Sequence, residues 1–266
     1  MLNEEQRVAS EEEAGEPLSY GSYLRVPELL SLQSPLGDPP VPDEMLFILV
    51  QQAQELWFKQ ILFDLHRVID DLTGGRVLDA VRLLVRLGRI MNVLGDEVDI
   101  LALMPPRAFH GFRAVLSPSS GFESHQFREL EYASGLDSPT FVKMLDKHMG
   151  MTELDKRWPV NLKQAAYDTL KEVSNDPTEA WTAIYDDAER FPTLFALAEA
   201  LSEYEVYFGV WRFKHIKLVD RTIGSHVPGT GGSAGSGYLQ KTLQYRFFPE
   251  LWEARNRVTL LHPGNS

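Results

Sequence analysis

A histidine in the last third of the chain has the surroundings of a ligand. His215 belongs to a series spaced alternately by four and three residues: Tyr204, Phe208, Trp211, His215, Leu218 and Thr222. On the α-helical period these side chains share one face, so the imidazole points toward a core, with Trp211 one turn before it. A neutral imidazole in such a place can bind a metal. A core histidine satisfied by one hydrogen bond is the simpler interpretation, and both stay open.

The segment that follows this helix is unusual in composition. Gly224 is expected to end the helix, and Pro228–Gly237 holds five glycines with no apolar side chain larger than alanine. Such a chain is flexible enough to close over a bound molecule, although a plain linker has the same composition. Together with His215, this loop indicates a site.

Two upstream stretches carry further polar groups among apolar neighbours. Phe47 and Gln51 stand four residues apart on one helix face, and Gln52 follows directly. A glutamine turned inward needs a hydrogen-bond partner in the protein or a polar ligand. Arg113 closes a short stretch that begins at Phe109, and its guanidinium could hold a carboxylate through two parallel hydrogen bonds. An interhelical hydrogen bond and an ordinary surface arginine are the alternatives.

Composition excludes several kinds of site. The chain of 266 residues has no cysteine, so disulfides, thiolate ligands and a thiol nucleophile are absent. The Gly-rich segment lacks the Gly-Lys-Ser/Thr sequence of a phosphate-binding loop, and no His-Glu-x-x-His pair occurs. Ser-His-Asp chemistry stays open, without a nucleophile-elbow motif. A single imidazole among aromatic residues suits haem iron with a proximal histidine best.

Charge and hydropathy restrict the partners. The formal net charge of −12 disfavours nucleic acid, which requires a basic surface. No apolar run is long enough to cross a membrane, and the acidic N-terminus lacks the apolar stretch of a signal peptide. The lack of cysteine fits a reducing compartment. We therefore expect a cytoplasmic protein with a small-molecule partner, no nucleic acid and no membrane.

The fold predicted from periodicity is all-α, a bundle of long helices. Residues 1–16 are acidic and without periodicity, so disorder is expected there, and residues 17–266 are expected to form a single all-helical domain. The stretches 34–42 and 107–121 should be irregular. Helices are predicted from Pro42 through Leu72, over Val77–Met104 and Phe122–Ala133, from Pro139 and from Pro177, over Leu194–Thr222 with a break near Ala200, and over Gln240–Arg257 with a bend at Phe248-Pro249.

Several short blocks resemble the tryptophan 2,3-dioxygenase family. In chain order they are Asp43–Ile48, Glu55–Lys59, Gly111–Arg113, Ser119–Phe122, Gln126–Arg128, Trp211–His215, Gly229–Ser233 and Phe247–Trp252. The resemblance runs from about residue 20 to residue 257, almost the whole chain. It implies an all-helical protein around a b-type haem, normally a homotetramer, that adds O2 across the indole C2–C3 bond of L-tryptophan.

The resemblance also implies roles by position. His215 matches the proximal iron ligand, Arg113 the residue that binds the substrate carboxylate, and Thr230 a residue near the ammonium and carboxylate groups on a mobile loop. The other matches are Phe47 and Leu116 in the walls of the indole pocket, Ser120 and Gly121 at the haem edge, Trp211 and Phe127 beside the haem, and Tyr20, Tyr23 and Leu24 in an N-terminal segment that completes a neighbouring subunit's pocket.

Three positions depart from the family pattern. Gln51 stands where the pattern has a distal histidine, and Phe109 and Phe127 stand where it has tyrosines. Gln51 can donate or accept a hydrogen bond but cannot act as a base near neutral pH. Phe109 lacks the hydroxyl that would contact the amino-acid head group. The pocket should therefore be less polar, with room for a β-substituted or ring-substituted tryptophan.

Four functions remain open at this stage. Gln51, Arg113 and Thr230 would assist catalysis in a dioxygenase that opens the indole ring to an N-formylkynurenine-type product. The same site could transfer one oxygen atom and give a 2-oxindole, for example from β-methyltryptophan. A haem-binding protein without turnover and a helical assembly protein without cofactor are the other two. Arg113 and Thr230 favour an enzyme, because a haem carrier needs no groups that hold an amino acid.

Overall fold

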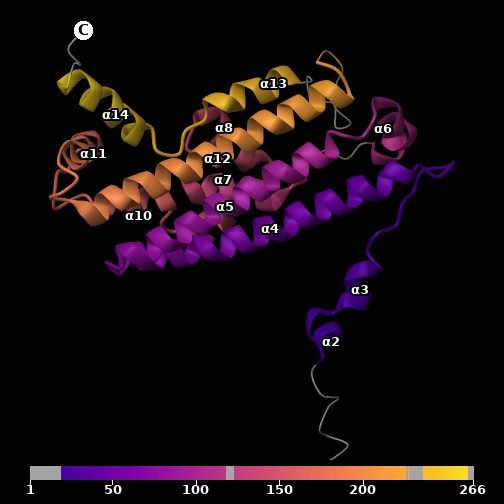
Figure 1. The fold of residues 1–266 in the computed structure, drawn as a ribbon, viewed down its shortest axis with the longest axis horizontal. Helices are drawn as coiled ribbons and strands as arrows, with labels where there is room; N and C mark the ends of the chain where they lie inside the picture. Colours follow the sequence, from indigo (N-terminus) through magenta and orange to yellow (C-terminus); the bar gives the residue numbers. More distant parts are fainter. Residues whose placement is uncertain (1–18, 118–122, 226, 228–235, 263–266) are drawn as a thin grey trace, which may run out of the picture.

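The long helices form the body of the protein. The computed structural model describes residues 19–117, 123–225, 227 and 236–262, and in these ranges every regular element is a helix. Three of them run alongside one another (Figure 1): α4 (Pro42–Thr73), α5 (Val77–Leu101) and α12 (Pro192–Thr222). Helix α5 packs against both α4 and α12. The predicted all-α fold is confirmed.

Helices α4 and α5 form an antiparallel pair joined by a tight turn. Pro42 occupies the first turn of α4, where its missing N–H costs no hydrogen bond. The acidic residues Asp43 and Glu44 beside it interact favourably with the positive end of the helix dipole. The turn includes Gly75 with φ +74°, a conformation that L side chains rarely adopt. Along the pair, the fully buried carboxylate of Asp64 accepts hydrogen bonds from Arg86 Nε at 2.9 Å and Nη2 at 2.5 Å. This pairing fixes the register of α4 against α5.

Helix α12 carries the predicted stripe without interruption. The predicted break near Ala200 is wrong, because residues 197–201 are leucine, alanine and one glutamate, all with high helix propensity. Tyr204 and Phe208 are fully buried, and Trp211 and Leu218 nearly so. The helix ends at Thr222, and Gly224 follows with φ +97°, as expected for a helix stop.

The shorter helices surround this body. Pro106 starts α6 (Pro106–Phe112), which continues into the 3-10 helix η1 (Arg113–Leu116), so the prediction of an irregular stretch over 107–121 is wrong for this part. Next come α7 (His125–Ser134), α8 (Pro139–Met149), α9 (Met151–Arg157), α10 (Leu162–Asp168) and α11 (Pro177–Asp186). Ser138 and Asp176 cap α8 and α11, as their Ser-Pro and Asp-Pro sequences predict.

The C-terminal part differs from its prediction. Instead of one bent helix, it forms α13 (Ser236–Lys241), the 3-10 helix η3 (Thr242–Gln244) and α14 (Pro249–Leu261). Phe247 and Phe248 lie between η3 and α14 and are buried, so their packing rather than helical propensity determines the backbone there.

The N-terminal arm consists of α2 (Tyr20–Leu24) and α3 (Val26–Leu30) and projects away from the helical body (Figure 1). Residues 1–18 lie outside the described ranges, so the division into a disordered segment and a single domain stays a prediction. Among the described helices, none is long and apolar enough to cross a membrane.

Candidate functional site

His215 stacks on Trp211 one turn earlier in α12. Their ring centroids lie 5.3 Å apart and their planes differ by 3°. Trp211 in turn contacts Phe127 of α7 at 4.7 Å and Phe58 of α4 at 6.3 Å between centroids. The imidazole is therefore held by an aromatic cluster contributed by three helices.

The environment of His215 keeps its ring neutral. Burial lowers the pKa of the imidazole to about 4, and the positive charge of Arg128 acts in the same direction. The side chain is nevertheless partly accessible, and no hydrogen bond connects it to another residue of the described ranges. Trp211 Nε1 is also buried there without a hydrogen-bond partner. A neutral imidazole with a free nitrogen lone pair is a competent metal ligand.

The lowered pKa of His215 gives a prediction for the apoprotein. A histidine with the ordinary pKa of 6.5 would lose ligand capacity as the pH falls below that value, whereas His215 stays neutral down to about pH 4. Haem uptake, followed by the Soret band in stopped flow, should therefore be nearly constant from pH 7 to about pH 5 and fall near pH 4. Circular dichroism at each pH controls for unfolding. A decline of about tenfold per unit starting at pH 6.5 would contradict the burial of this imidazole.

A second aromatic group lies at the N-terminal end of α4. The ring centroid of Phe47 is 6.1 Å from Phe109 and 5.4 Å from Phe112, both on α6. Phe109 and Phe112 are buried, while Arg113, the first residue of η1, is half-buried. The structure thus brings Phe47 and Phe109 together, and Arg113 directly follows Phe112 in the chain. Leu116 lies one turn further along η1 and is also half-buried.

The glutamines of α4 do not lie as predicted. Gln51 is exposed, and Gln52 is half-buried, with its Oε1 accepting from Gln33 Nε2 at 2.5 Å and its Nε2 donating to the Leu32 carbonyl at 3.1 Å. The alternative of an interhelical hydrogen bond is not met for Gln52, because its partners Leu32 and Gln33 lie in the chain after α3 and not in a helix. The buried glutamine is Gln54, because the inward positions of this helix are 50, 54 and 58, and Gln51 lies to the side of them.

The remaining predicted site residues divide into those outside the described ranges, those on the arm and one in the aromatic cluster. Ser120, Gly121 and Thr230 lie outside the described residues. Tyr20, Tyr23 and Leu24 are on the projecting arm and are 79%, 70% and 45% exposed. Phe127, in contrast, is buried against Trp211.

One functional candidate was missed by sequence reasoning. Glu55 of α4 accepts hydrogen bonds from Ser124 and Gln126 at the start of α7, and thereby connects the two helices that bear Phe58 and Phe127. Its position one turn after Gln51 was the available signal, but the partners lie about seventy residues away in the chain.

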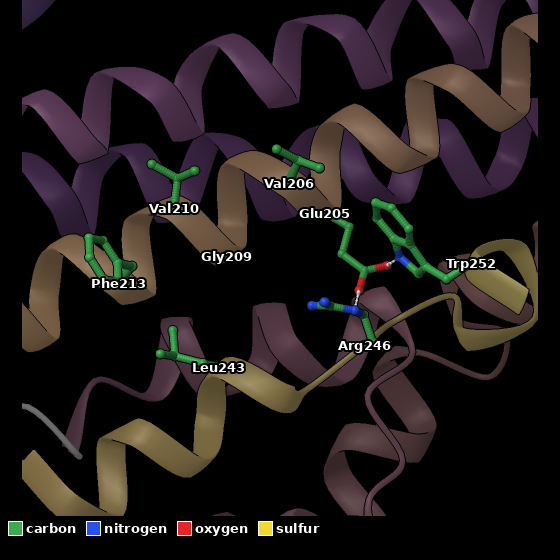
Figure 2. A pocket seen from close by; sticks show the side chains of 8 residues that line it. All are labelled: Glu205, Val206, Gly209, Val210, Phe213, Leu243, Arg246 and Trp252. Atoms are coloured by element: carbon green, nitrogen blue, oxygen red, sulfur yellow. Dashed lines mark hydrogen bonds and ion pairs between the residues drawn. The ribbon is translucent and has the colours of Figure 1, made fainter. Parts of the chain in front are cut away.

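A separate groove, whose lining side chains Figure 2 shows, has a volume of about 310 Å³. At its edge, Glu205 Oε2 accepts from Trp252 Nε1 at 3.0 Å, Glu205 Oε1 lies 3.7 Å from Arg246 Nε, and burial raises the pKa of the carboxyl. Phe213 lines the groove and precedes His215 by two residues, about 200° around the helix. The groove is therefore across α12 from the imidazole and outside the candidate site. Its lining is Glu205, Val206, Gly209, Val210, Phe213, Leu243, Arg246 and Trp252.

Comparison with known proteins decides the family. A family model described as tryptophan 2,3-dioxygenase matches residues 3–167 and 171–258. The chain belongs to the tryptophan 2,3-dioxygenase family. Its similar relatives include proteins named tryptophan 2,3-dioxygenase from Nocardioides sp. (38% identical, over 92% of this chain and 97% of the relative), Bacillus anthracis (36%, over 91% and 94%) and Caulobacter vibrioides (38%, over 91% and 98%).

Membership of the tryptophan 2,3-dioxygenase family makes the chain a haem-dependent oxidoreductase with O2 as co-substrate. The residues present fit that cofactor. His215 offers a neutral nitrogen with no hydrogen bond to another described residue, and it stacks on Trp211, which itself packs on Phe127 and Phe58. In the described ranges, no group of three or more His, Cys, Asp or Glu side chains could hold a metal ion by itself.

Proposed function

We propose that this chain oxidises the indole ring of L-tryptophan with O2, transferring both oxygen atoms across the C2–C3 bond to give an N-formylkynurenine-type product. The carrying observation is the apolar wall of Phe47, Phe109 and Phe112 that leads directly into Arg113. An aromatic wall beside a guanidinium suits a molecule with a flat apolar side chain and a carboxylate. Relatives over the whole chain that are named for this activity support it.

The protein residues have distinct parts in this proposal. His215 holds the haem, which when bound supplies the iron centre for dioxygen chemistry. Phe47 and Leu116 line the space for the indole, and Arg113 binds the carboxylate and so fixes the orientation of the ring. Thr230 would contact the amino-acid head group. Gln51 is exposed on α4 in the structure; if it faces the substrate as its position in the family pattern implies, it would offer the indole nitrogen a hydrogen bond but no base, so proton removal from that nitrogen is not assigned to the protein.

The test uses purified, haem-loaded and reduced protein given L-tryptophan under oxygen. The expected result is a product that carries two added oxygen atoms by mass and shows kynurenine-type absorbance. A preparation with a normal haem spectrum that consumes no tryptophan would contradict the proposal.

A second candidate function is single-oxygen transfer to a substituted tryptophan. The observation that favours it is the loss of polar groups, with Gln51, Phe109 and Phe127 in place of a histidine and two tyrosines. The buried ring of Phe109 packs on Phe47 and Phe112 and offers no hydroxyl to the substrate. Giving β-methyltryptophan in place of tryptophan distinguishes the two. A product with one added oxygen from the methylated substrate alone would favour this candidate.

The proposal includes a homotetramer in which the N-terminal arm completes a neighbour's pocket. The base of the arm is fixed to α4, because the Glu44 carboxylate accepts from the backbone N–H of Leu36 at 2.7 Å and of Gly37 at 2.8 Å. Beyond that point Tyr20 and Tyr23 are largely exposed on α2. Cytoplasmic location likewise stays a prediction, from the absence of cysteine.

Substituting both arm tyrosines is expected to weaken this assembly. Tyr20→Ser with Tyr23→Ser removes two large exposed rings that have little contact with their own subunit, so the monomer should keep its thermal stability. Light scattering should show that the variant dissociates at a higher protein concentration than the parent protein. KM for tryptophan should also rise. A matched change of another exposed apolar residue, Leu260→Ser on α14, should do neither. An unchanged molar mass of the assembly and an unchanged KM in the tyrosine variant would show that the arm takes no part in the site.

A further inference from the structure

Glu55 makes the most complete side-chain connection between α4 and α7. Its Oε1 accepts from Ser124 Oγ at 2.5 Å, and its Oε2 accepts from Gln126 Nε2 at 2.7 Å. The same Gln126 amide donates to the Glu55 backbone carbonyl at 3.0 Å. Both carboxylate oxygens thus have partners, and hydrogen bonds to a charged group are the stronger kind.

The two partners of Glu55 are located at the point where α7 begins. Ser124 is the N-cap of α7, since its Oγ accepts from the backbone N–H of Phe127 at 3.3 Å. One hydroxyl therefore serves both the cap and the connection to α4. The first turn of α7 cannot shift along α4 without breaking the contacts of Glu55.

The first turn of α7 bears the ring that supports the histidine. Phe127 packs against Phe58, one turn after Glu55 on α4, with centroids 5.3 Å apart, and against Trp211 at 4.7 Å. Trp211 stacks on His215. A continuous series of contacts therefore runs from the Glu55 carboxylate through the start of α7 to the imidazole.

We propose that Glu55 is a positioning residue of the haem site: it fixes the start of α7 so that Phe127 holds Trp211, and with it His215, in place for the iron. The proposal rests on the proposed function only in taking His215 as the haem ligand. It predicts that changes at Glu55 affect how firmly haem is held more than they affect folding.

Helix α7 itself provides a matched control. Glu129 is buried, and like Glu55 it accepts from two side chains, Arg157 Nη1 at 2.5 Å and Trp158 Nε1 at 2.8 Å. Its partners lie on the side of α7 that faces the end of α9. Glu129→Gln therefore disturbs a comparable hydrogen-bond pair on α7 without touching the contacts between Phe127 and Trp211.

The experiment compares Glu55→Gln, Glu129→Gln, Gln126→Glu and the exchange variant Glu55→Gln with Gln126→Glu. Haem loss from the ferric protein to an excess of apo-globin is timed, and the Tm of each apoprotein is measured. Glu55→Gln should lose haem about tenfold faster than the parent, as expected for one charge-assisted hydrogen bond. Gln126→Glu should lose haem faster still, since it places a second carboxylate against that of Glu55. The exchange variant should recover part of the loss, because it restores one donor facing one carboxylate.

The control decides between positioning and general stability. Glu129→Gln should lower Tm as much as Glu55→Gln while its haem loss stays within about twofold of the parent. Equal haem loss in these two variants at equal Tm would overturn the proposal, as would an exchange variant no better than either single change. A parent protein that never binds haem would instead contradict the proposed function, so the two failures are distinguishable.

Discussion

Replacing His215 by glycine is expected to give a folded protein that takes up no haem and that regains haem when imidazole is added. The reason is that we propose the neutral ring of His215 as the haem ligand, since it stacks on Trp211 and has no hydrogen bond to another described residue. Glycine leaves a cavity that a free imidazole can enter. The cost of one glycine in a helix is about 1 kcal/mol, so the fold should persist.

The measurement is the Soret absorbance of the reconstituted variant with and without imidazole, with circular dichroism as the check of folding. His125→Ala is the control, since His125 is exposed at the start of α7 and should leave haem binding unchanged. A His215→Gly variant that keeps the parent spectrum without imidazole would show that another group binds the iron.

Replacing Arg113 by leucine is expected to lower kcat/KM for tryptophan by about a hundredfold while haem content stays normal. A bidentate pair between a guanidinium and a carboxylate contributes about 3 kcal/mol, which corresponds to a factor of roughly 150. Arg113 directly follows Phe112, whose buried ring packs on Phe47, so its backbone is anchored next to these aromatic rings. Most of the loss should appear in KM, because the contact exists before the chemical step.

Two further variants make this test specific. Arg113→Lys keeps the positive charge but lacks the paired N–H donors of a guanidinium, so its kcat/KM should lie between those of the parent and Arg113→Leu. Arg107→Leu changes an exposed arginine of α6, the short helix that precedes Arg113, and should leave KM unchanged. Tryptamine, which lacks the carboxylate, should be an equally poor substrate for the parent and for Arg113→Leu. A larger loss for tryptamine in the variant would place Arg113 elsewhere in the mechanism.

Much of the fold could be predicted because local chemistry marks the helix ends. Prolines at the first turn and the caps Ser138 and Asp176 start helices where expected, and Gly224 follows the end of α12 with a left-handed conformation. The 107–121 stretch shows the limit of this reasoning. It was predicted to be irregular after Pro105 and Pro106, whereas Pro106 starts α6 because a helix tolerates proline in its first turn.

The candidate site was only partly visible in the sequence. The stripe of α12 fixes the direction of His215 because the period of one helix is a local property. Gln51 could not be placed in the same way, since the inward face of α4 depends on its packing with α5 and α7. Glu55 was missed for a related reason. Its carboxylate connects α4 to α7 through hydrogen bonds from Ser124 and Gln126, and no local sequence pattern connects residues so distant in the chain.

The most direct test of the central claim is a turnover of L-tryptophan by the reduced, haem-loaded protein under oxygen-18 gas, with the product analysed by mass. If His215 holds the haem and Arg113 holds the substrate for dioxygenation, the product should contain two labelled oxygen atoms from the gas. A product with one labelled atom would make the protein a monooxygenase. A product without label, or none at all from a protein with a normal haem spectrum, would contradict the assignment of this site to indole oxidation.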